Sequence, residues 1–356
     1  MPPAPPPKGV QKTGSHFINW ITYGFFALVI LVIIVGVAFK IRQRLLASRT
    51  QPAPPPGATL KQTLAASPLK VKSVAFAAGG RLIVAGCNDG SIKVWDAETG
   101  SLVRTLRGHE RDVRAVAVSP DGQLVLSGGA DRSLRLWDVS TGELKQTLHE
   151  HQGEVFTVAF APDGRTWASG GEDRSIILWD AMTAQPVRRL NGHEDWVYAL
   201  AFSPDSKTLI SGGSDYSIRV WDAGSGVVHK VLNRDNSLEI VRALAFAPDG
   251  RTFASGGDML RLWDAKTGAL KFALRGHTDW LRAVAFSSDG RWLASCSNDQ
   301  TIRLWKASDG ELVQTLSAHA DMATAVAFAP GGKVLASASD DGSVKLWDLS
   351  ALKSSE

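Results

Sequence analysis

The chain has few cysteines, and its first part has no acidic residues. Only Cys87 and Cys296 occur among 356 residues; this excludes a disulfide framework and weakly favours a reducing compartment. Residues 1–57 contain no Asp or Glu but hold six of the 39 Lys and Arg residues, so the remaining 33 face 35 acidic residues. The basic character therefore belongs to the first part, and composition does not favour a nucleic-acid partner for the rest.

The same first part contains an uncharged stretch, FINWITYGFFALVILVIIVGVAF, at residues 17–39. As a helix it would extend roughly 34 Å, enough to cross a hydrocarbon core of about 30 Å. We expect a single transmembrane helix there, with Trp20 and Tyr23 near one membrane interface. A cleaved signal peptide remains an alternative, although its apolar core is shorter and leads to a small-residue cleavage site.

Basic residues around this stretch predict its orientation. Lys8 and Lys12 precede it, and four basic residues follow it, Lys40, Arg42, Arg44 and Arg49. The positive-inside tendency then places the rest of the chain in the cytoplasm, with the extracytoplasmic side as the alternative. We expect a disordered Pro-rich start at 1–16, the membrane helix at 17–39, a basic and Pro-rich linker at 40–57, a repeat domain at 58–350 and a tail at 351–356.

The repeat domain is defined by tryptophans that recur every 42 residues. They are Trp95, Trp137, Trp179, Trp221, Trp263, Trp305 and Trp347. Each unit contains four short apolar runs, for example VRAVAVS, LVLSGG, LRLWD and LKQTL, separated by turn residues such as Pro120-Asp121-Gly122. This pattern predicts that each unit is a four-stranded antiparallel meander.

These units resemble the WD-repeat β-propellers, whose signature is a Gly-His pair, a Ser-Gly-x-x-Asp turn and a Trp-Asp pair. Trp-Asp stands in six units, and Lys306 replaces the Asp in the sixth. The resemblance, to a bacterial-type member with a single N-terminal membrane anchor, covers about residues 58–350 and implies an all-β, seven-bladed propeller. An eight-bladed, quinone-dependent dehydrogenase propeller is a remote alternative because its Thr-Gly turns look similar, but the His and Asp spacings follow the WD pattern.

An extra strand predicts how the ring closes. The phrase LKQTL occurs at residues 60–64 and again at 144–148, and the seventh unit ends without its own outer strand. Seven inner triplets and seven outer strands match only if residues 60–64 complete the last blade. We expect this circular closure, which also removes exposed sheet edges.

A Ser, His, Asp and Trp set recurs in five units, which favours a structural role over catalysis because an active site does not normally occur five times. In the family this set resembles a buried hydrogen-bond chain, since a buried Trp N–H and a buried carboxylate each need partners. The tetrads are His109, Ser127, Asp131 and Trp137; His151, Ser169, Asp173 and Trp179; His193, Ser211, Asp215 and Trp221; His277, Ser295, Asp299 and Trp305; and His319, Ser337, Asp341 and Trp347.

Two units depart from the tetrad. Unit one has Ser67 and Ala85 where His and Ser are expected, and unit five lacks the His and has a longer loop before its first strand. These units are expected to be less rigid; the longer loop has either a functional role or none. No catalytic motif, metal set or cofactor-binding loop accompanies the repeats: His149-x-His151 has no further ligand beside it, and the glycine pairs repeat at one strand end.

The resemblance also implies a partner-binding face. Members of the family commonly bind peptides or proteins through residues three and five places after the His and one place before the Asp. In this sequence these positions are Lys70, Lys72, Asn88, Asp112, Arg114, Ala130, Glu154, Phe156, Glu172, Trp196, Tyr198, Ser214, Ile240, Arg242, Trp280, Arg282, Asn298, Met322, Thr324 and Asp340. Aromatic and Arg side chains are the usual interface anchors. The partner-binding candidates are therefore Arg114, Phe156, Trp196, Tyr198, Arg242, Trp280 and Arg282.

Together these patterns predict a membrane-anchored, non-enzymatic scaffold without cofactor or metal that docks a protein or peptide. Both ends of the repeat domain fall on the face opposite the Gly-His loops, so the docking face is expected to point away from the membrane. We expect a monomeric propeller, contact with the lipid bilayer through 17–39 and no nucleic-acid partner. A regulatory or assembly subunit of an integral membrane enzyme complex is the alternative, and a catalytic or cofactor-binding propeller is a remote one.

Overall fold

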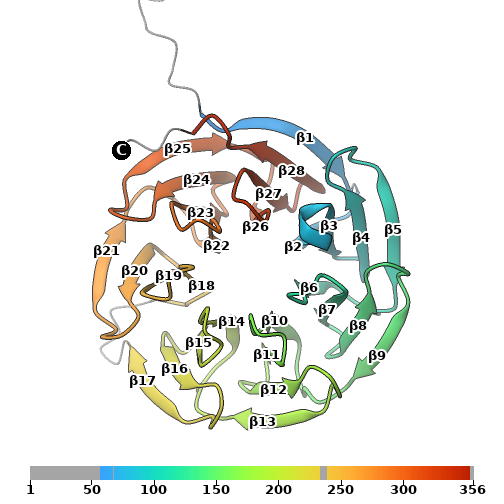
Figure 1. The fold of residues 1–356 in the computed structure, drawn as a ribbon, viewed down its shortest axis with the longest axis vertical. Helices are drawn as coiled ribbons and strands as arrows, with labels where there is room; N and C mark the ends of the chain where they lie inside the picture. Colours follow the sequence, from blue (N-terminus) through green and yellow to red (C-terminus); the bar gives the residue numbers. More distant parts are fainter. Residues whose placement is uncertain (1–56, 67, 233–238, 353–356) are drawn as a thin grey trace, which may run out of the picture. The chain divides into compact units, whose positions relative to one another are not determined.

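The computed structural model describes residues 57–66, 68–232 and 239–352, which lie in the second of two compact units, Gly57–Glu356. These residues form seven four-stranded antiparallel sheets arranged around a ring (Figure 1). The prediction of an all-β, seven-bladed propeller is therefore confirmed.

Each blade contains consecutive strands from the ring centre outward, except the last, in which β1 is outermost. The first three blades are β2 (Val71–Ala77), β3 (Leu82–Cys87), β4 (Ser91–Asp96) and β5 (Leu102–Arg107); β6 (Val113–Val118), β7 (Leu124–Gly129), β8 (Leu134–Asp138) and β9 (Leu144–Leu148); and β10 (Val155–Phe160), β11 (Thr166–Gly171), β12 (Ile176–Asp180) and β13 (Pro186–Leu190). The next three are β14 (Val197–Phe202), β15 (Thr208–Gly213), β16 (Ile218–Asp222) and β17 (Val228–Leu232); β18 (Ala243–Phe246), β19 (Thr252–Gly256), β20 (Leu260–Asp264) and β21 (Leu270–Leu274); and β22 (Leu281–Phe286), β23 (Trp292–Ser297), β24 (Thr301–Lys306) and β25 (Leu312–Ser317). Blade 7 is β26 (Ala323–Phe328), β27 (Val334–Ser339), β28 (Ser343–Asp348) and β1 (Thr59–Ala65).

The Trp-Asp pair has a local role at the turn between the third and fourth strands. The carboxylate of Asp138 accepts the backbone N–H groups of Ser140 and Thr141 at 2.9 Å each. The Ser140 hydroxyl, followed by the Thr141 N–H, lowers the pKa of Asp138 to about 2. Gly142 then adopts a φ of 78°, a left-handed conformation that glycine enters without steric cost. The Asp and Gly that recur together in blades 1, 2, 4 and 5 therefore specify the tight turn that starts the outer strand of each of these blades.

β1 closes the ring by joining the last blade. It pairs antiparallel with β28, with Thr59 opposite Asp348 and Ala65 opposite Ser343, and Figure 1 shows it as the outermost strand beside β28. Leu64 is 2% exposed in the core between blades 7 and 1. The Ala58 N–H donates to Gln314 Oε1 at 2.7 Å, and Gln62 Nε2 donates to the Thr99 carbonyl at 3.0 Å. β1 and the residue before it thus contact blades 6, 7 and 1, and β1 completes the last blade as predicted.

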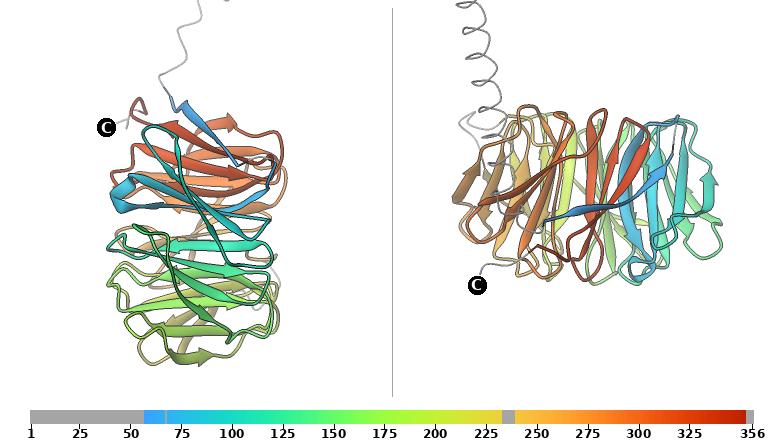
Figure 2. Two further views of the ribbon diagram at one scale, coloured as in Figure 1. Left: turned by 90° about the vertical axis from the view of Figure 1, so that its right-hand side faces the viewer. Right: turned by 90° about the horizontal axis from the view of Figure 1, so that it is seen from above.

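The hydrophobic core is divided among the interfaces between blades. Seven clusters of buried side chains occur in the described chain, and each combines residues of two neighbouring blades. In one of them Val84 and Ile92 of the first blade pack with Val113 and Trp137 of the second. Figure 2 shows the blades side by side around the ring. Because each sheet buries both faces against its neighbours, the ring stabilises every blade from two sides.

The predicted localisation, a single-pass membrane protein with its propeller in the cytoplasm, is wrong. Across residues 57–66, 68–232 and 239–352, no helix is long and apolar enough to cross a membrane. The helix found there, η1 (Ala78–Gly80), has three residues, whereas a span needs about 20. The stretch 17–39, to which the prediction assigned the span, lies outside the described residues, as do the boundaries predicted at 16 and 39. We therefore do not assign this chain, or its partner, to a membrane.

Candidate functional site

The five predicted tetrads are assembled in blades 2, 3, 4, 6 and 7. In blade 4, His193 Nδ1 lies 2.8 Å from Asp215 and His193 Nε2 lies 2.7 Å from Ser211 Oγ. The Trp221 indole N–H donates to the same Ser211 oxygen at 2.8 Å. The other four blades repeat this geometry, with Trp-to-Ser distances of 2.9–3.0 Å. Each chain links the second and third strands of a blade to the loop before its first strand.

The proton inventory of this chain is complete. An ionised carboxylate can only accept hydrogen bonds, so His193 is protonated at Nδ1 and donates this N–H to Asp215. His193 Nε2 is unprotonated and accepts the Ser211 hydroxyl. The Ser211 oxygen in turn accepts the Trp221 N–H. Every donor therefore meets one acceptor, which is the condition under which buried polar groups stabilise a fold instead of destabilising it.

The electrostatics of the tetrads favour an ionised Asp. Burial opposes ionisation of Asp215, but the hydrogen bonds from His193 and from the Glu194 N–H outweigh burial and hold its pKa at about 2. Asp341 also has a pKa of about 2, because the Ser343 hydroxyl and the Ala320 N–H outweigh burial. Burial lowers the pKa of His277 and His319 in spite of their Asp partners.

The tetrads do not form a hydrolytic site. All five serines have no exposed surface, so a substrate carbonyl cannot reach their hydroxyl oxygens, and each oxygen already accepts a Trp N–H. A nucleophilic Ser needs an open approach beside its base. His151 likewise uses both ring nitrogens, on Asp173 and Ser169, so it is not free to ligate a metal together with His149. The arrangement can hold strands together and does not supply a reacting atom.

A fifth member of each tetrad was missed by the sequence reasoning. A hydroxyl two residues after the Asp donates to the Asp carboxylate at 2.6–2.9 Å. These residues are Ser133, Ser175, Ser217, Thr301 and Ser343. The signal was present, because the hydroxyls recur at the repeat period. A hydroxyl beside a turn reads as ordinary turn chemistry, which concealed its contact with the carboxylate.

Blades 1 and 5 keep only parts of the network. In blade 5 the Trp263 N–H still donates to Ser255 Oγ at 2.8 Å, and Arg261 pairs with Asp258 at 2.7 Å where the other blades have a His–Asp pair. In blade 1 Ser91 still donates to Asp89, whereas Ala85 cannot accept a Trp N–H. The predicted lower rigidity of these blades remains a prediction.

A separate group of side chains points into the centre of the ring, at the end that carries the tetrad loops. In six blades the antiparallel register of the innermost strand slips by one residue, and the residue at that bulge is Lys72, Arg114, Phe156, Tyr198, Arg282 or Thr324. A β-bulge bends its strand and re-aims a side chain. Arg242 holds the corresponding position just before β18 in blade 5. We call these seven residues the inward positions.

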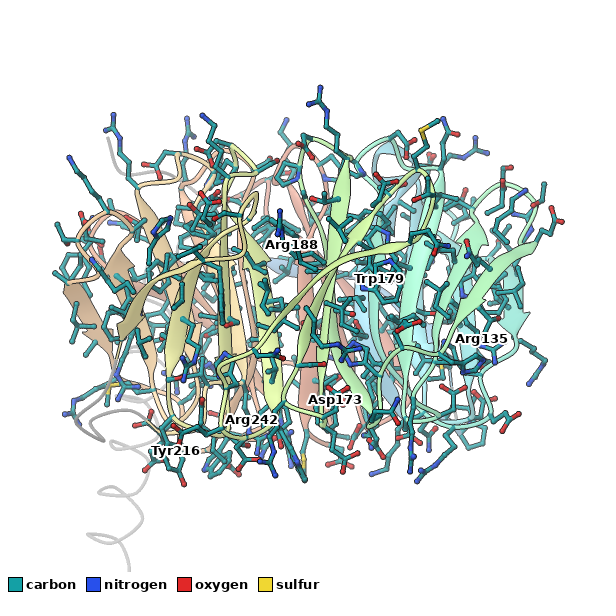
Figure 3. The ribbon with its side chains drawn as sticks, turned by 90° about the horizontal axis from the view of Figure 1, so that it is seen from below. Arg135, Asp173, Trp179, Arg188, Tyr216 and Arg242 are labelled. Carbon is teal, nitrogen blue, oxygen red and sulfur yellow. The ribbon has the colours of Figure 1, made fainter. Side chains whose placement is uncertain are left out.

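The inward positions line a cavity of about 530 Å³ that we call the channel mouth. Its lining comprises Lys72, Arg114, Glu154, Phe156, Glu172, Trp196, Tyr198, Arg242, Arg282, Met322, Thr324 and Asp340. All twelve belong to the ring of positions named from the sequence. Six of the seven partner-binding candidates are thus brought together, and the seventh, Trp280, packs on Arg242. Figure 3 shows Arg242, Tyr216 and Asp173 toward the same face of the ring.

Four inward side chains, Arg114, Phe156, Arg242 and Arg282, meet the residue two places before the inward position of the next blade. Arg114 donates from Nε and Nη2 to Glu154 Oε2 at 3.1 and 2.9 Å. The Phe156 and Trp196 ring centroids are 5.7 Å apart, and the Arg242 guanidinium lies 4.6 Å from the Trp280 ring centroid.

The chemistry of the mouth is thus set by the pairs at successive blade interfaces, and it differs around the ring. Aromatic rings gather at blades 3 and 4, where Phe156 contacts both Trp196 and Tyr198, with 5.0 Å between the Phe156 and Tyr198 centroids. Trp196 is 39% exposed, Trp280 36% and Met322 37%, so large apolar groups face solvent at the mouth. Aromatic and Arg groups that remain exposed are those that dominate protein interfaces.

Comparison with known protein families supports the fold reading. Residues 58–258 match the family model described as the WDR36/Utp21 second beta-propeller domain. Residues 268–306 and 310–348 each match the WD domain, G-beta repeat. Together the matched regions cover residues 58–348 except 259–267 and 307–309. They do not support a bacterial-type assignment or an N-terminal anchor.

Curated relatives match over a single repeat. Nuclear distribution protein PAC1-2 of Uncinocarpus reesii is 52% identical over 42 residues, and nuclear distribution protein PAC1 of Arthroderma benhamiae is 50% identical over 42 residues. PAC1 of Trichophyton verrucosum gives the same 50%. These alignments cover 12% of this chain and 9% of each relative. The similarity is therefore that of one repeat unit.

Proposed function

The chain belongs to the WD-repeat β-propeller family, with the WDR36/Utp21 second propeller domain as its matching model, and from this premise we propose that it is a non-enzymatic scaffold that docks a protein or peptide partner at the channel mouth. The observation that supports this proposal is the convergence of the seven inward side chains on one cavity of about 530 Å³. Six bulges, together with Arg242 just before β18, aim seven side chains at one cavity and make a concave surface that no single blade could form.

The composition of the mouth supports a macromolecular partner. Trp196 lines the opening with Phe156, Tyr198 and the arginines. Trp280 packs on Arg242, and both tryptophans are more than one third exposed. Exposure of large aromatic side chains to water is unfavourable in free energy, and a partner that covers these side chains removes this cost. Arg114, Arg242 and Arg282 add directional donors that recognise polar groups between the apolar contacts.

The tetrads serve the scaffold in this proposal. They fix the loops from which the inward strands start, since each His lies a few residues before an inward position and is tied to two strands of its own blade. Rigid support lowers the entropy lost on binding, because the anchors are already in place.

The proposal is tested by quantitative partner capture. The full chain, tagged, is used to capture cross-linked partners from the cells that make it, and mass spectrometry compares wild type with the double variant Trp196→Ala and Trp280→Ala. Loss of two central aromatic anchors is expected to weaken specific partners about 30-fold or more.

The control removes apolar groups that are equally exposed but lie at the other end of the blade. Met182, 96% exposed, and Val187, 54% exposed, lie in and after the turn that follows β12. The double variant Met182→Ala and Val187→Ala should keep the partners. Unchanged capture by the tryptophan variant would place the docking surface elsewhere, and equal losses in both variants would show that the effect is not specific to the mouth.

A further inference from the structure

Three arginines at inward positions meet different neighbours. Arg114 is neutralised by Glu154 through two hydrogen bonds and lies 3.4 Å from Asp112. Arg242 meets the Trp280 ring instead, and Arg282 donates to the Asn298 amide oxygen at 2.6 Å and contacts the Met322 sulfur at 3.9 Å. Among the described residues no carboxylate pairs with Arg242 or Arg282. The mouth therefore has one side, at Arg114, where a carboxylate neutralises the arginine, and another side, at Arg242 and Arg282, where none does. We call the second the unmatched side.

The aromatic faces on the unmatched side are already occupied. The Arg242 guanidinium lies 4.8 Å from the Tyr198 ring centroid and 4.6 Å from that of Trp280, so each of these two rings already contacts a cation of the chain itself. A cationic group of a partner, such as a lysine or methylated lysine, would compete with Arg242 for these rings and would be repelled by it. The charge of Arg242 therefore disfavours a cation at these two rings and favours an anion beside them.

The two arginines also oppose each other. Burial and the neighbouring charge of Arg282 lower the pKa of Arg242, and the Arg242 Nε–H is buried without an acceptor in the described chain. Two guanidinium groups on one side of a cavity, both lining it, cost electrostatic free energy until an anion lies between them. A planar carboxylate fits the fork of donors that each guanidinium presents.

We propose that Arg242 and Arg282 bind the carboxylate of an Asp or Glu side chain in a peptide segment of the partner, with a neighbouring apolar side chain of that segment against Phe156 and Trp196. This inference rests on the proposed docking function and adds the chemical class of the ligand. In this proposal Tyr198 and Trp280 hold the Arg242 guanidinium in place before the acidic side chain binds.

The rest of the mouth restricts this ligand to a short acidic segment. Glu154, Glu172 and Asp340 also line the cavity, and Asp340 is held by Lys72 at 2.7 Å and Lys70 at 3.3 Å. These carboxylates would repel a polyanion such as nucleic acid, whereas one or two acidic side chains can reach the arginines alone. The acid does not come from residues 1–57 of the chain, which contain no Asp or Glu.

The ligand class is tested with peptide pools on the full chain. Bead-bound pools of acetylated, amidated octapeptides have random outer positions and one of four central pairs: two glutamates, two glutamines, two lysines or two phosphoserines. Retention of the labelled full chain is measured at low and at high salt. The glutamate pool is expected to retain roughly tenfold more chain than the glutamine pool at low salt, and the lysine pool the least.

Substitutions locate the effect. Arg282→Gln should remove the preference for the glutamate pool, and Arg242→Lys, which keeps the charge but loses the fork, should reduce it. Arg188→Gln is the matched control, because Arg188 lies on β13 and donates to the Gly224 carbonyl away from the mouth (Figure 3). It should keep the full preference. Circular dichroism and thermal melting verify that each variant is folded. If Arg242→Lys does not fold, Arg282→Gln alone tests the inference.

Every other outcome overturns the inference. Equal retention of the glutamate and glutamine pools, including no retention of any pool, contradicts acid recognition. If only the phosphoserine pool retains the chain, the arginines bind phosphate and not a carboxylate. If the preference for glutamate persists in Arg282→Gln, the acidic side chain binds at another surface. The proposed docking function is judged separately, by partner capture with the Trp196 and Trp280 substitutions and their Met182 and Val187 control, and no result with the peptide pools decides it.

Discussion

Blades 4 and 5 are neighbours built from the same repeat, yet they are held together differently. Blade 4 has the complete His193, Ser211, Asp215 and Trp221 chain, and its first strand, β14, has six residues. Blade 5 keeps only the Trp263–Ser255 bond and an Arg–Asp pair, and β18 has four residues with no register slip in its described pairing. The missing tetrad coincides with a shorter inner strand and with the one inward arginine that stands outside a strand, Arg242.

This difference teaches how far a blade depends on the ring around it. Blade 5 lacks most of the polar network, yet its core residues Phe253 and Leu262 are 1% and 0% exposed. Its buried side chains belong to the two clusters shared with blades 4 and 6. Packing from both sides therefore keeps blade 5 in place, and the tetrad adds local rigidity at one end.

Opening the ring should break this comparison most severely. Deleting residues 58–65 removes β1, exposes the edge of β28 and removes Leu64 from the core between blades 7 and 1. The exposed edge should pair with other molecules, so we expect soluble aggregates and no cooperative unfolding transition. Size-exclusion chromatography and hydrogen exchange measure this, with blade 5 losing protection before blade 4.

The matched control deletes residues 2–50 and leaves β1 in place. This variant should elute as a monomer and unfold cooperatively. A chain without residues 58–65 that is as monomeric and as stable as this control would show that β1 does not close the ring.

Serine substitutions compare the two networks directly. Ser211→Ala in blade 4 leaves both the Trp221 N–H and the His193 Nε2 without a partner, at an expected cost of about 3 kcal/mol in the free energy of unfolding. Ser255→Ala in blade 5 leaves only the Trp263 N–H unpaired, at about 1.5 kcal/mol. Urea unfolding measures both, and the exposed Ser288→Ala should cost almost nothing. Equal costs for the two buried serines would show that the His adds nothing to the chain in blade 4.

Acid should remove the advantage of blade 4. A carboxyl whose pKa is lower in the folded than in the unfolded state stabilises the fold above its unfolded pKa and loses this contribution as pH falls. For Asp215, with an ordinary value of 3.8 and a folded pKa of about 2, the loss occurs between about pH 4 and pH 2. His277 and His319 act in the same direction from their ordinary value of 6.5 downward, because burial lowers their pKa.

The acid effect is measured by urea unfolding at pH 7, 5 and 3. Asp215→Asn should cost about 1–2 kcal/mol at pH 7 and flatten the decline toward pH 3. Asp258→Asn in blade 5 should cost less than about 1 kcal/mol, since its partner pair is partly exposed. If the free energy of unfolding of Asp215→Asn falls toward pH 3 as steeply as that of the wild type, the acid sensitivity comes from other groups.

The smallest stability effect is expected at the mouth. Trp196→Ala and Trp280→Ala remove side chains that are 39% and 36% exposed, so each should change the free energy of unfolding by about 1 kcal/mol or less. Thermal melting of the double variant measures this beside the Ser211→Ala variant. A larger loss than that of Ser211→Ala would make these tryptophans part of the core and would remove them as docking anchors.

The sequence allowed the repeat, the number of blades and the strand borrowed for closure to be predicted, because these depend on a strict period and on matching inner with outer strands. The tetrad residues could be named because a buried hydrogen-bond chain requires fixed residue types at fixed spacing. The resemblance to the family named 20 positions for the mouth, and all twelve residues that line it are among them.

The contacts between blades could not be predicted in the same way. That Arg114 meets Glu154 while Arg242 meets Trp280 depends on how neighbouring twisted sheets pack, and on bulges that no residue type marks. The compensation in blade 5 by Arg261 and Asp258 was also not visible, because an Arg–Asp pair three residues apart is common on surfaces. The membrane localisation was wrong because it was based on one apolar stretch outside the described residues.

Closure by β1 has a consequence for how the protein is made. The ribosome synthesises β1 before any other strand of the ring and its partner β28 after all of them, since Thr59 pairs with Asp348. A nascent chain must therefore keep one ribbon unpaired during nearly the whole of translation, and any product truncated before β28 retains an open edge that chaperones or proteases can recognise.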